Sequence, residues 1–331
     1  MATSYIRKKY QPTSGPGKTA GAEKGTTWNL QEQRRWKTIV GNSIAYIILI
    51  MVSLFFVMPL FYTISTSLKY EQDVFDGKLI PSPIIDPVFH NFFGRANLEN
   101  VDSDINYDGA FFAGMGSTGA VPPFAVYYFN SVFVSAMITI LQLITCSLAA
   151  YAFSRLNWPG RDKVFLAYLG TMMVPGQVTM IPVFILFKNM GILDSYIALI
   201  LPGAFSAYGT FMLRQYFLSI PKELEEAGII DGATKLQILR QIIIPLSKTA
   251  LATMAIFTFL YAWNDFMWPL IVVNSEGMKT LPIGLMAFQT SYGASWHLIM
   301  AASLIVLIPV IAIFIAGQKF ITRGIMMTGM K

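Results

Sequence analysis

The chain has 331 residues, of which 54% are hydrophobic and only 13% are charged. Charged residues make up about 25% of an ordinary soluble domain, so this composition indicates an integral membrane protein. The single cysteine, Cys146, excludes a disulfide framework, and the two histidines, His90 and His297, are too far apart in sequence to suggest a metal-ligand cluster.

The N-terminal residues 1–36 are predicted to form a disordered basic tail, because they are rich in Gly, Ser, Thr, Pro and Lys. Within the tail, Ser14–Thr19 is similar to part of a phosphate-binding loop. That motif needs a glycine five residues before Gly17, but Pro12 stands there, and no apolar strand precedes the segment. We therefore expect neither nucleotide binding nor a catalytic residue in this chain.

Six apolar runs are each long enough to cross a bilayer as a helix, which takes about 20 residues. They lie at roughly 39–66, 127–153, 164–187, 195–213, 246–272 and 297–317. All six are predicted as helices, because a non-helical span leaves backbone groups unpaired in lipid. The first run is too long for the apolar core of a signal peptide, so we expect it to stay as a span. The predicted fold class is an all-α membrane protein with six transmembrane helices.

Positive charges divide unequally between the two sides of these spans. The two termini, the 154–163 loop and the 214–248 segment together hold 19 of the 24 Lys and Arg residues. Because positive residues stay cytoplasmic, both termini are predicted to face the cytoplasm. The long loop at about 67–126 then faces outward, and it is acidic. The net charge of +6 reports this topology rather than nucleic-acid binding.

The apolar centres of the spans contain almost no ionisable residues, which argues against a proton or ion relay. Energy for active transport should therefore enter from outside the membrane. Neutral polar residues, helix breaks and residues at the outer end of a span give six candidates for a translocation path. These candidates are Asn130, Gln142, Gln177, Thr179, Asn264 and Asp265.

The candidates also have structural explanations. Pro175 and Pro182 interrupt the third span, which either lines a water-filled cavity or is a kinked helix packed on its neighbours. Asn130 and Gln142 in the second span either line a polar route or hold helices together by hydrogen bonds.

The outer end of the fifth span combines tryptophans with polar residues. Trp263 and Trp268 are expected to be interfacial anchors. Asn264 and Asp265 are the better candidates for shaping the outer mouth of a path.

A polar segment between the fourth and fifth spans, Glu223–Pro245, is predicted to form a cytoplasmic helix–turn–helix. Pro221 favours a helix start, and three glutamates follow near the positive end of the helix. Asp231 and Gly232 break that helix, with Gly232 able to take a left-handed conformation. The pattern leaves open whether the segment folds onto its own protein or meets a partner.

The second helix of this segment is predicted to start with a capping box at Thr234–Gln237. Leu236, Leu239 and Ile243 share one face of the helix, which runs to Pro245.

The same segment resembles the EAA loop of binding-protein-dependent ABC importer permeases. That pattern is Glu-Ala-Ala, three residues, Gly, nine residues, then Ile-x-Leu-Pro. Here Glu226–Gly228 stands at the triplet, Gly232 at the glycine and Ile242–Pro245 at the end. Gly228 replaces the second alanine and Ile244 replaces the leucine, and both exchanges are small or apolar.

The resemblance covers about residues 37–331 and follows the carbohydrate-type permeases, closest to the maltose-type permease subunit. The further matches are Asn130-Ser131, Leu148–Arg155, Pro159–Arg161, Gln177–Phe187, Leu213–Gln215, Ile220–Leu224, Ala262–Asp265, Trp268-Pro269 and Thr280–Pro282. Residues 1–36 and the loop 67–126 fall outside the resemblance, and their roles stay open.

The resemblance implies the transmembrane permease subunit of an ATP-driven importer for a sugar or oligosaccharide. Its partners would be a second permease subunit in a heterodimer, a dimer of ATPase subunits that hold ATP and Mg, and an extracytoplasmic solute-binding protein. The chain itself would bind no cofactor or metal and would not be an enzyme. The last external loop, about Asn274–Trp296, would reach toward the binding protein.

The resemblance also implies that the EAA loop is a coupling helix that docks in a groove of the ATPase. The predicted docking residues are Glu226, Ala227, Gly228, Asp231, Gly232, Ala233 and Leu236.

Two other functions compete with the importer. A self-sufficient channel or ion-coupled carrier predicts flux without an ATPase. A receptor or scaffold that uses the acidic external loop predicts binding without flux.

Overall fold

A computed structural model of the chain describes residues 22–69, 73–75, 77–78, 92, 124–290, 293–294 and 296–328. The chain divides into two compact units, Met1–Phe61 and Tyr62–Lys331. Residues 1–21 of the predicted tail and most of the predicted external loop 67–126 lie outside the described residues.

The regular elements of the described chain are helices and one small antiparallel hairpin, in which β1 (Gln289–Thr290) pairs with β2 (Gly293–Ala294). Its helices, in chain order, are α1 (Ala22–Ser67), α3 (Phe124–Arg155), α4 (Arg161–Gly170), α5 (Gly176–Met190), α6 (Tyr196–Ile200), α7 (Ala207–Leu218), α8 (Glu223–Ile230), α9 (Lys235–Ile238), α10 (Ile244–Leu246), α11 (Lys248–Trp263), α12 (Met267–Val272), α13 (Leu281–Gly284) and α14 (Trp296–Thr328). The 3-10 turns are Thr171–Met173, Leu201–Ala204, Glu276–Met278 and Leu285–Phe288, and a π turn covers Leu239–Ile243.

α1 contains the first predicted span. Its side chains from Trp36 to Phe61 are all exposed, as suits a helix whose apolar surface contacts lipid. Residues 22–36 form the first turns of this helix, although the sequence predicts a disordered tail there. Strong helix formers in the run Gln31–Arg35 extend the apolar helix toward the N-terminus.

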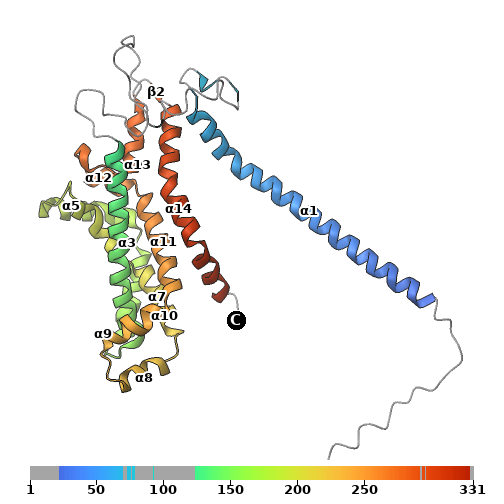
Figure 1. Ribbon diagram of the computed structural model, residues 1–331. Coiled ribbons are helices and arrows are strands. Elements are labelled where there is room, and N and C mark those ends of the chain that lie inside the picture. The colour runs from blue at the N-terminus through green and yellow to red at the C-terminus, as the bar shows by residue number, and fades with distance from the viewer. Residues whose placement is uncertain are drawn as a thin grey trace, which may run out of the picture. The chain divides into compact units, whose positions relative to one another are not determined.

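In the second unit, α3 packs along α7 and α11, and α11 packs along α14 (Figure 1). Buried apolar residues of the described chain form three clusters along α3: one with α7 and α9, one with α13 and α14, and one with α5, α6 and α12. Gly209 allows the close contact of α7, because a Cβ there would lie 2.5 Å from Met254 Cε and 3.1 Å from Cys146 Sγ.

Three helix pairs are bent at a break. The sequence predicts an interruption of the third span at Pro175 and a helix end at Pro245 before the fifth span, whereas it predicts the fourth span as one continuous helix. The angle at the break is 97° between Arg161–Met173 and Gly176–Met190, 41° between Tyr196–Ala204 and Ala207–Leu218, and 80° between Lys235–Leu246 and Lys248–Trp263. At the first break Val174 is extended (φ −85°, ψ 118°), because the residue before a proline, here Pro175, is excluded from the helical region. Among the described residues, three helices are long and apolar enough to cross a membrane, or up to six spans if each bent pair is one.

The predicted fifth span, 246–272, is divided into α11 and α12. Trp263 at the end of α11 is buried and packs against the rings of Tyr128 and Phe259, so its prediction as an interfacial anchor is wrong. Trp268 donates its indole N–H to a carbonyl of α6 at 2.9 Å. The ring of Trp263 therefore fills the interior of the bundle, and the half-buried Trp268 connects α12 to α6.

Candidate functional site

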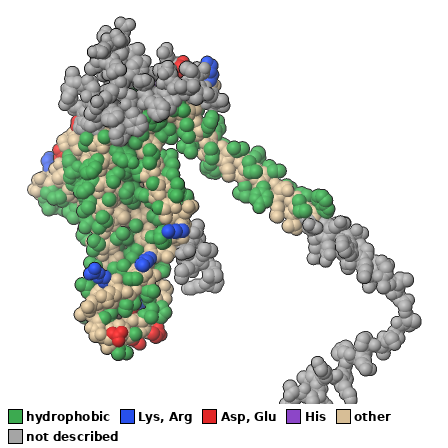
Figure 2. Space-filling view, in the orientation of Figure 1, with side chains coloured by type: hydrophobic (Ala, Val, Ile, Leu, Met, Phe, Trp, Pro, Cys, Tyr) green, Lys and Arg blue, Asp and Glu red, His purple; other side chains and the backbone are tan. Residues whose placement is uncertain are grey.

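Acidic side chains gather at the end of the second unit that α8 forms (Figure 2). We call residues 223–238, which comprise α8, the turn after it and α9, the α8–α9 tip. The sequence explains the start of α8, since Glu223, Glu225 and Glu226 lie in its first turn, where negative charge stabilises the positive end of a helix.

Gly232 forms the turn of the tip in the predicted left-handed conformation, with φ at 82°. A Cβ at this position would meet no atom within 4 Å, so backbone conformation rather than crowding requires glycine. The N–H of Gly232 donates to Ile229 O at 3.0 Å, and the N–H of Ala233 donates to Gly228 O at 2.9 Å. These bonds satisfy carbonyls at the end of α8 and fix the direction of α9.

The predicted capping box at the start of α9 is confirmed. The N–H of Gln237 donates to Thr234 Oγ1 at 3.4 Å, and the N–H of Thr234 donates to Gln237 Oε1 at 2.7 Å. The predicted shared face of the second helix is wrong for Leu236, which is 65% exposed while Leu239 and Ile243 are buried. The π turn that begins at Leu239 widens the helix and rotates its buried face away from Leu236.

The predicted docking residues divide between exposed and packed positions. The exposed ones are Glu226, Ala227, Asp231, Gly232 and Leu236. Ala233 is half-buried, and Gly228 is buried. A Cβ on Gly228 would lie 3.0 Å from Ile242 Cδ1 and 3.6 Å from Ile238 Cγ1. Gly228 therefore lets α8 pack closely on the following segment, instead of facing outward.

Exposed apolar side chains also lie on the tip, and three of them were not among the predicted docking residues. The apolar members are Leu224, Ile229, Ile230 and Leu236. Ile230 is 85% exposed, although it precedes a turn in a charged segment. Two consecutive isoleucines directly before Asp-Gly are a sequence signal that could have found them. A small apolar patch among acidic residues is typical of a surface that binds another protein.

Two charged residues at the base of the tip were also not predicted as site residues. Arg155, the last residue of α3, and Glu225 of α8 form an ion pair of 2.9 Å, and the Arg155 side chain is only 3% exposed. Arg155 Nη2 also donates to the carbonyls of Phe217 and Ile220. Burial raises the pKa of Glu225, and the positive charge of Arg155 opposes that shift.

Gln142 lies in the wall of a cavity of about 450 Å³ between α3, α7 and α11. The other lining residues are Pro202, Gly203, Phe205, Ser206, Tyr208, Gly209, Met212, Met254, Phe257, Thr258 and Tyr261. Gln142 Nε2 donates to Gly203 O at 3.0 Å, and Gln142 Oε1 accepts from Thr258 Oγ1 at 2.5 Å. None of these lining side chains is charged.

The break between α6 and α7 frees backbone carbonyls that α3 satisfies. Thr145 Oγ1 donates to Ala204 O at 2.7 Å, and Cys146 Sγ donates to Ser206 O at 3.3 Å. Together with the bond from Gln142, these contacts hold an irregular backbone that a membrane interior could not otherwise accommodate. These side chains of α3 thus hold the break by hydrogen bonds, while Gln142 also lines the cavity.

Asn130 is buried at the opposite end of α3. Its Nδ2 donates to Gly277 O and Lys279 O, both at 2.9 Å, and its Oδ1 accepts from Tyr196 Oη at 2.7 Å. Asn130 therefore ties the segment after α12 to α3 and α6.

The remaining path candidates lie on other elements. Gln177 and Thr179 are exposed in the first turns of α5. Asn264 donates from Nδ2 to a carbonyl of α11 at 2.7 Å, and Asp265 accepts at 3.4 Å from a backbone N–H at the start of α12. None of the four lines the cavity of Gln142. The structure therefore does not bring the six candidates together.

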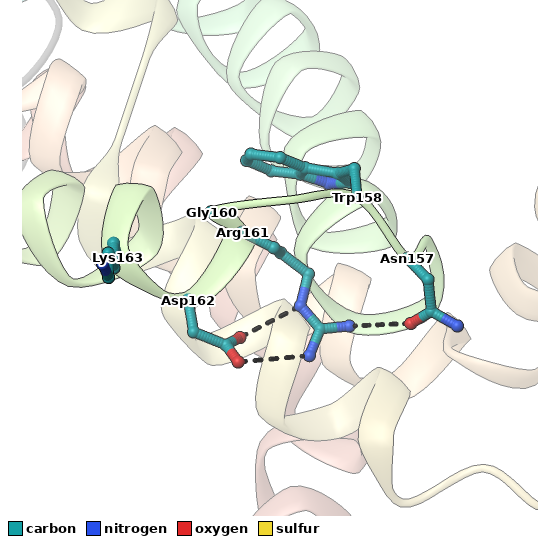
Figure 3. Close-up of a pocket in the computed structure, with 6 residues that line it drawn as sticks. All are labelled: Asn157, Trp158, Gly160, Arg161, Asp162 and Lys163. Atoms are coloured by element: carbon teal, nitrogen blue, oxygen red, sulfur yellow. Dashed lines mark hydrogen bonds and ion pairs between the residues drawn. The ribbon is translucent and has the colours of Figure 1, made fainter.

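A second cavity, of about 330 Å³, lies at the turn between α3 and α4 (Figure 3). Arg161 uses all three of its nitrogen atoms within this turn, donating to Asp162, to Asn157 and to the carbonyl of Leu156. The bond from Arg161 lowers the pKa of Asp162. These charges hold the turn together. No group of metal-ligating side chains that could hold a metal occurs in the described part of the chain.

The predicted external loop Asn274–Trp296 begins with a clamp on Asp194. Asp194 Oδ1 accepts from the N–H of Asn274 and from the N–H and hydroxyl of Ser275, each at 3.0 Å. These donors, above all the N–H of Ser275, lower the pKa of Asp194. The start of the loop is therefore fixed to the segment before α6.

Known proteins are similar in sequence to more than half of this chain. The family "binding-protein-dependent transport system inner membrane component" matches residues 142–326. The arabinooligosaccharides transport system permease protein AraQ of Halalkalibacterium halodurans is 38% identical over 205 residues, which are 62% of this chain and 74% of that protein. The sn-glycerol-3-phosphate transport system permease protein UgpE of Yersinia enterocolitica is 37% identical over 215 residues, 64% of this chain and 76% of that protein.

A solved structure has the same fold. It is a bacterial ABC transporter involved in the import of the acidic polysaccharide alginate, and one of its chains matches with a TM-score of 0.67 and 24% identity. The match covers 92% of this chain and 99% of that chain. The predicted resemblance is thus confirmed: the chain belongs to the family of binding-protein-dependent transport system inner membrane components.

Proposed function

We propose that the chain is the transmembrane permease subunit of an ATP-driven importer and carries a sugar or oligosaccharide into the cytoplasm. The observation that carries this proposal is the α8–α9 tip, an exposed apolar patch among acidic residues on a chain of this permease family. The cargo follows from the relatives, one of which is named for arabinooligosaccharides.

The proposed topology has six spans with both termini and the tip in the cytoplasm. The distribution of 19 of the 24 Lys and Arg residues supports it, because positive residues stay on the cytoplasmic side. In this topology each bent helix pair acts as one span.

The tip is the proposed docking site for a separate ATPase subunit, which would hold ATP and Mg. Its exposed residues, including Glu226, Asp231 and Leu236, contact the ATPase, while Gly228 holds α8 in place from behind. When ATP closes the ATPase dimer, the tip moves with it and drives the spans between inward-open and outward-open states. This chain supplies no catalytic residue or cofactor to that cycle.

The cavity of Gln142 is the proposed part of the translocation path on this chain. Its volume of about 450 Å³ lies in the range of about 300–1,000 Å³ that is common for ligand pockets. A second permease subunit would close its open side. Because its lining combines aromatic rings with neutral polar groups, we assign a neutral sugar rather than a phosphorylated polyol as the cargo.

The other partners are an external solute-binding protein and the second permease subunit. The proposed contact with the binding protein is the segment Asn274–Trp296, whose start is held by Asp194 and Asn130. Asn264 and Asp265 at the end of α11 are proposed to shape the mouth that receives the cargo.

Uptake by proteoliposomes tests the proposal. The chain is reconstituted with its candidate second permease, ATPase and binding protein, and uptake of radiolabelled sugars is followed with and without ATP. We expect uptake only with ATP and all components. ATP-independent flux would instead identify a channel or carrier, and sugar binding without flux would identify a receptor.

The cargo is tested in the same vesicles by competition. A neutral oligosaccharide should inhibit uptake, whereas sn-glycerol-3-phosphate should not. Inhibition by the phosphorylated polyol alone would contradict the assignment from the cavity.

A further inference from the structure

One arginine at the base of the α8–α9 tip connects three elements. Arg155 ends α3. Its Nη2 donates to the carbonyl of Phe217 in the last turn of α7 and to that of Ile220 just after α7, and its Nη1 pairs with Glu225 of α8 at 2.9 Å. The carbonyls at the end of a helix lack partners within that helix, so a buried arginine there is well placed to bind them.

Glu225 is the glutamate of α8 that faces the bundle. Its side chain is 13% exposed, whereas Glu223 and Glu226 on the same helix are exposed. An ion pair this deeply buried must overcome the cost of removing both charges from water. Turning α8 away would leave the buried charge of Arg155 without its partner, so the pair holds α8 in one orientation toward α3 and α7.

The other contacts of α8 do not join it to α3 or α7. Gly228 packs on Ile238 and Ile242, which belong to the segment that continues into α11. Toward α7, the chain connection runs through Pro221 and Lys222, which are both exposed. Among the described side chains, the Arg155–Glu225 pair is thus the polar link from α8 to the helices α3 and α7.

We propose that Arg155 is the positioning residue that passes the movement of the α8–α9 tip to α3 and α7. The proposal rests on the proposed function of the tip. The guanidinium has a rigid planar fork that binds Glu225 and two carbonyls at once, so the three elements move as one body. A lysine keeps the charge but lacks the fork, and it should transmit the movement less well.

The test compares sugar uptake and ATP hydrolysis in the reconstituted complete transporter. Glu225→Gln removes the charge that Arg155 binds, and the double variant Arg155→Met with Glu225→Met removes both charges while it keeps apolar volume. Arg240→Gln, which removes an exposed charge outside the tip, is the control. Arg155→Lys tests the need for the fork.

We expect the variants of the pair to assemble and hydrolyse ATP but to lose uptake per ATP hydrolysed by roughly 2- to 30-fold, the range of mutations that weaken coupling between sites. Arg155→Lys should fall between these variants and the wild type, and Arg240→Gln should match the wild type. Retained uptake per ATP in the double variant would overturn the proposal. Failure of both Glu225→Gln and the double variant to assemble would also overturn it, because the pair would then serve assembly.

These outcomes differ from failure of the proposed function. If the wild-type complex shows no ATP-driven uptake, the importer function itself is wrong. If the wild type and the variants of the pair have equal coupling, only the role of Arg155 is wrong.

Discussion

At the scale of single residues, Gly232 and Asp194 are two of the positions where the chain takes a positive φ angle. Gly232 turns the chain between α8 and α9, and Asp194 (φ 57°) turns it between α5 and α6. Glycine adopts this conformation freely, whereas aspartate and asparagine tolerate it because their short side chains bond nearby backbone groups. Each residue therefore suits the turn between two helices in which it lies.

Replacing Gly232 tests the need for its conformation. Gly232→Ala should destabilise the turn by about 1–2 kcal/mol, and Gly232→Asn by less, because asparagine accepts a positive φ more readily. Thermal unfolding of the detergent-solubilised protein measures the effect. Gly170→Ala is the control, since Gly170 has φ −57° and open space around it. Equal melting temperatures for the Gly232→Ala and Gly170→Ala variants would contradict the argument.

The clamp at Asp194 predicts a loss of stability in acid. Because its pKa is lowered in the folded protein, its contribution is present above the ordinary value of 3.8 and is lost as the pH falls through the lowered value. Asp194→Asn keeps an acceptor oxygen and tolerates the positive φ, but it removes the charge. Melting temperatures from about pH 7 to about pH 3 should therefore fall less in this variant than in the wild type.

A comparison variant separates charge from side-chain bonding at this clamp. Ser275→Ala removes the hydroxyl donor but keeps both backbone donors to Asp194. It should retain most of the acid dependence. The idea is wrong if the Asp194→Asn variant shows the same acid dependence as the wild type.

At the scale of elements, the break between α6 and α7 shows how a span can be interrupted. The break before α7 is stabilised from both sides. The carbonyls of its turn bind side chains of α3, and Ser206 Oγ accepts from the N–H of Gly209 at 3.0 Å as the cap of α7. A membrane helix can break here because the carbonyls of Gly203, Ala204 and Ser206 and the N–H of Gly209 have partners within the protein.

Removing the cap of α7 should weaken the bundle. We expect Ser206→Ala to lower the stability by about 1 kcal/mol, because a backbone N–H at the start of α7 loses its acceptor. Denaturation of the purified protein in mixed micelles measures this change. The control is Ser219→Ala at the other end of α7, an exposed serine that bonds only its own helix. An equally large effect at Ser219 would remove the special role of the cap.

At the scale of the whole molecule, the α8–α9 tip is the surface that we propose to bind a partner protein. Its apolar side chains are exposed, and α8 lies at one end of the second unit, beyond α3, α7 and α11 (Figure 1). Burying them against a partner is favourable in proportion to the apolar area removed from water.

Ile230 tests this docking. Ile230→Ser should weaken binding of the ATPase subunit by about 1–2 kcal/mol, roughly a tenfold rise in Kd, and leave the stability of the isolated chain unchanged. Binding of the purified ATPase to nanodisc-embedded permease measures the affinity. Gln241→Ala, an exposed exchange beyond α9, is the control. Unchanged affinity for Ile230→Ser would place the docking surface elsewhere.

Much of the fold is predictable from local rules. The apolar runs, the left-handed Gly232 and the capping box of Thr234 and Gln237 all depend on neighbouring residues, and the structure contains each of them. The bends of the spans were less predictable. A proline such as Pro175 marks a break, but the angle depends on what the two halves pack against.

The roles of single polar residues were the least predictable from sequence. Asn130 and Gln142 have the composition of path residues, yet both bind backbone carbonyls of segments distant in the chain. Arg155 and Glu225 are 70 positions apart by number, and no local pattern pairs them.

The sequence by itself determined the membrane class, the candidate spans, the family and the geometry of the tip's turn, because composition, hydrophobic length and turn chemistry act over short stretches of chain. Only the tertiary structure decided that Glu225 is the glutamate of α8 that faces the bundle, that Asn130 binds the segment after α12, and which side chains line the cavity of Gln142. Those outcomes depend on contacts between segments far apart in sequence, where a buried polar group must find its partner across the bundle.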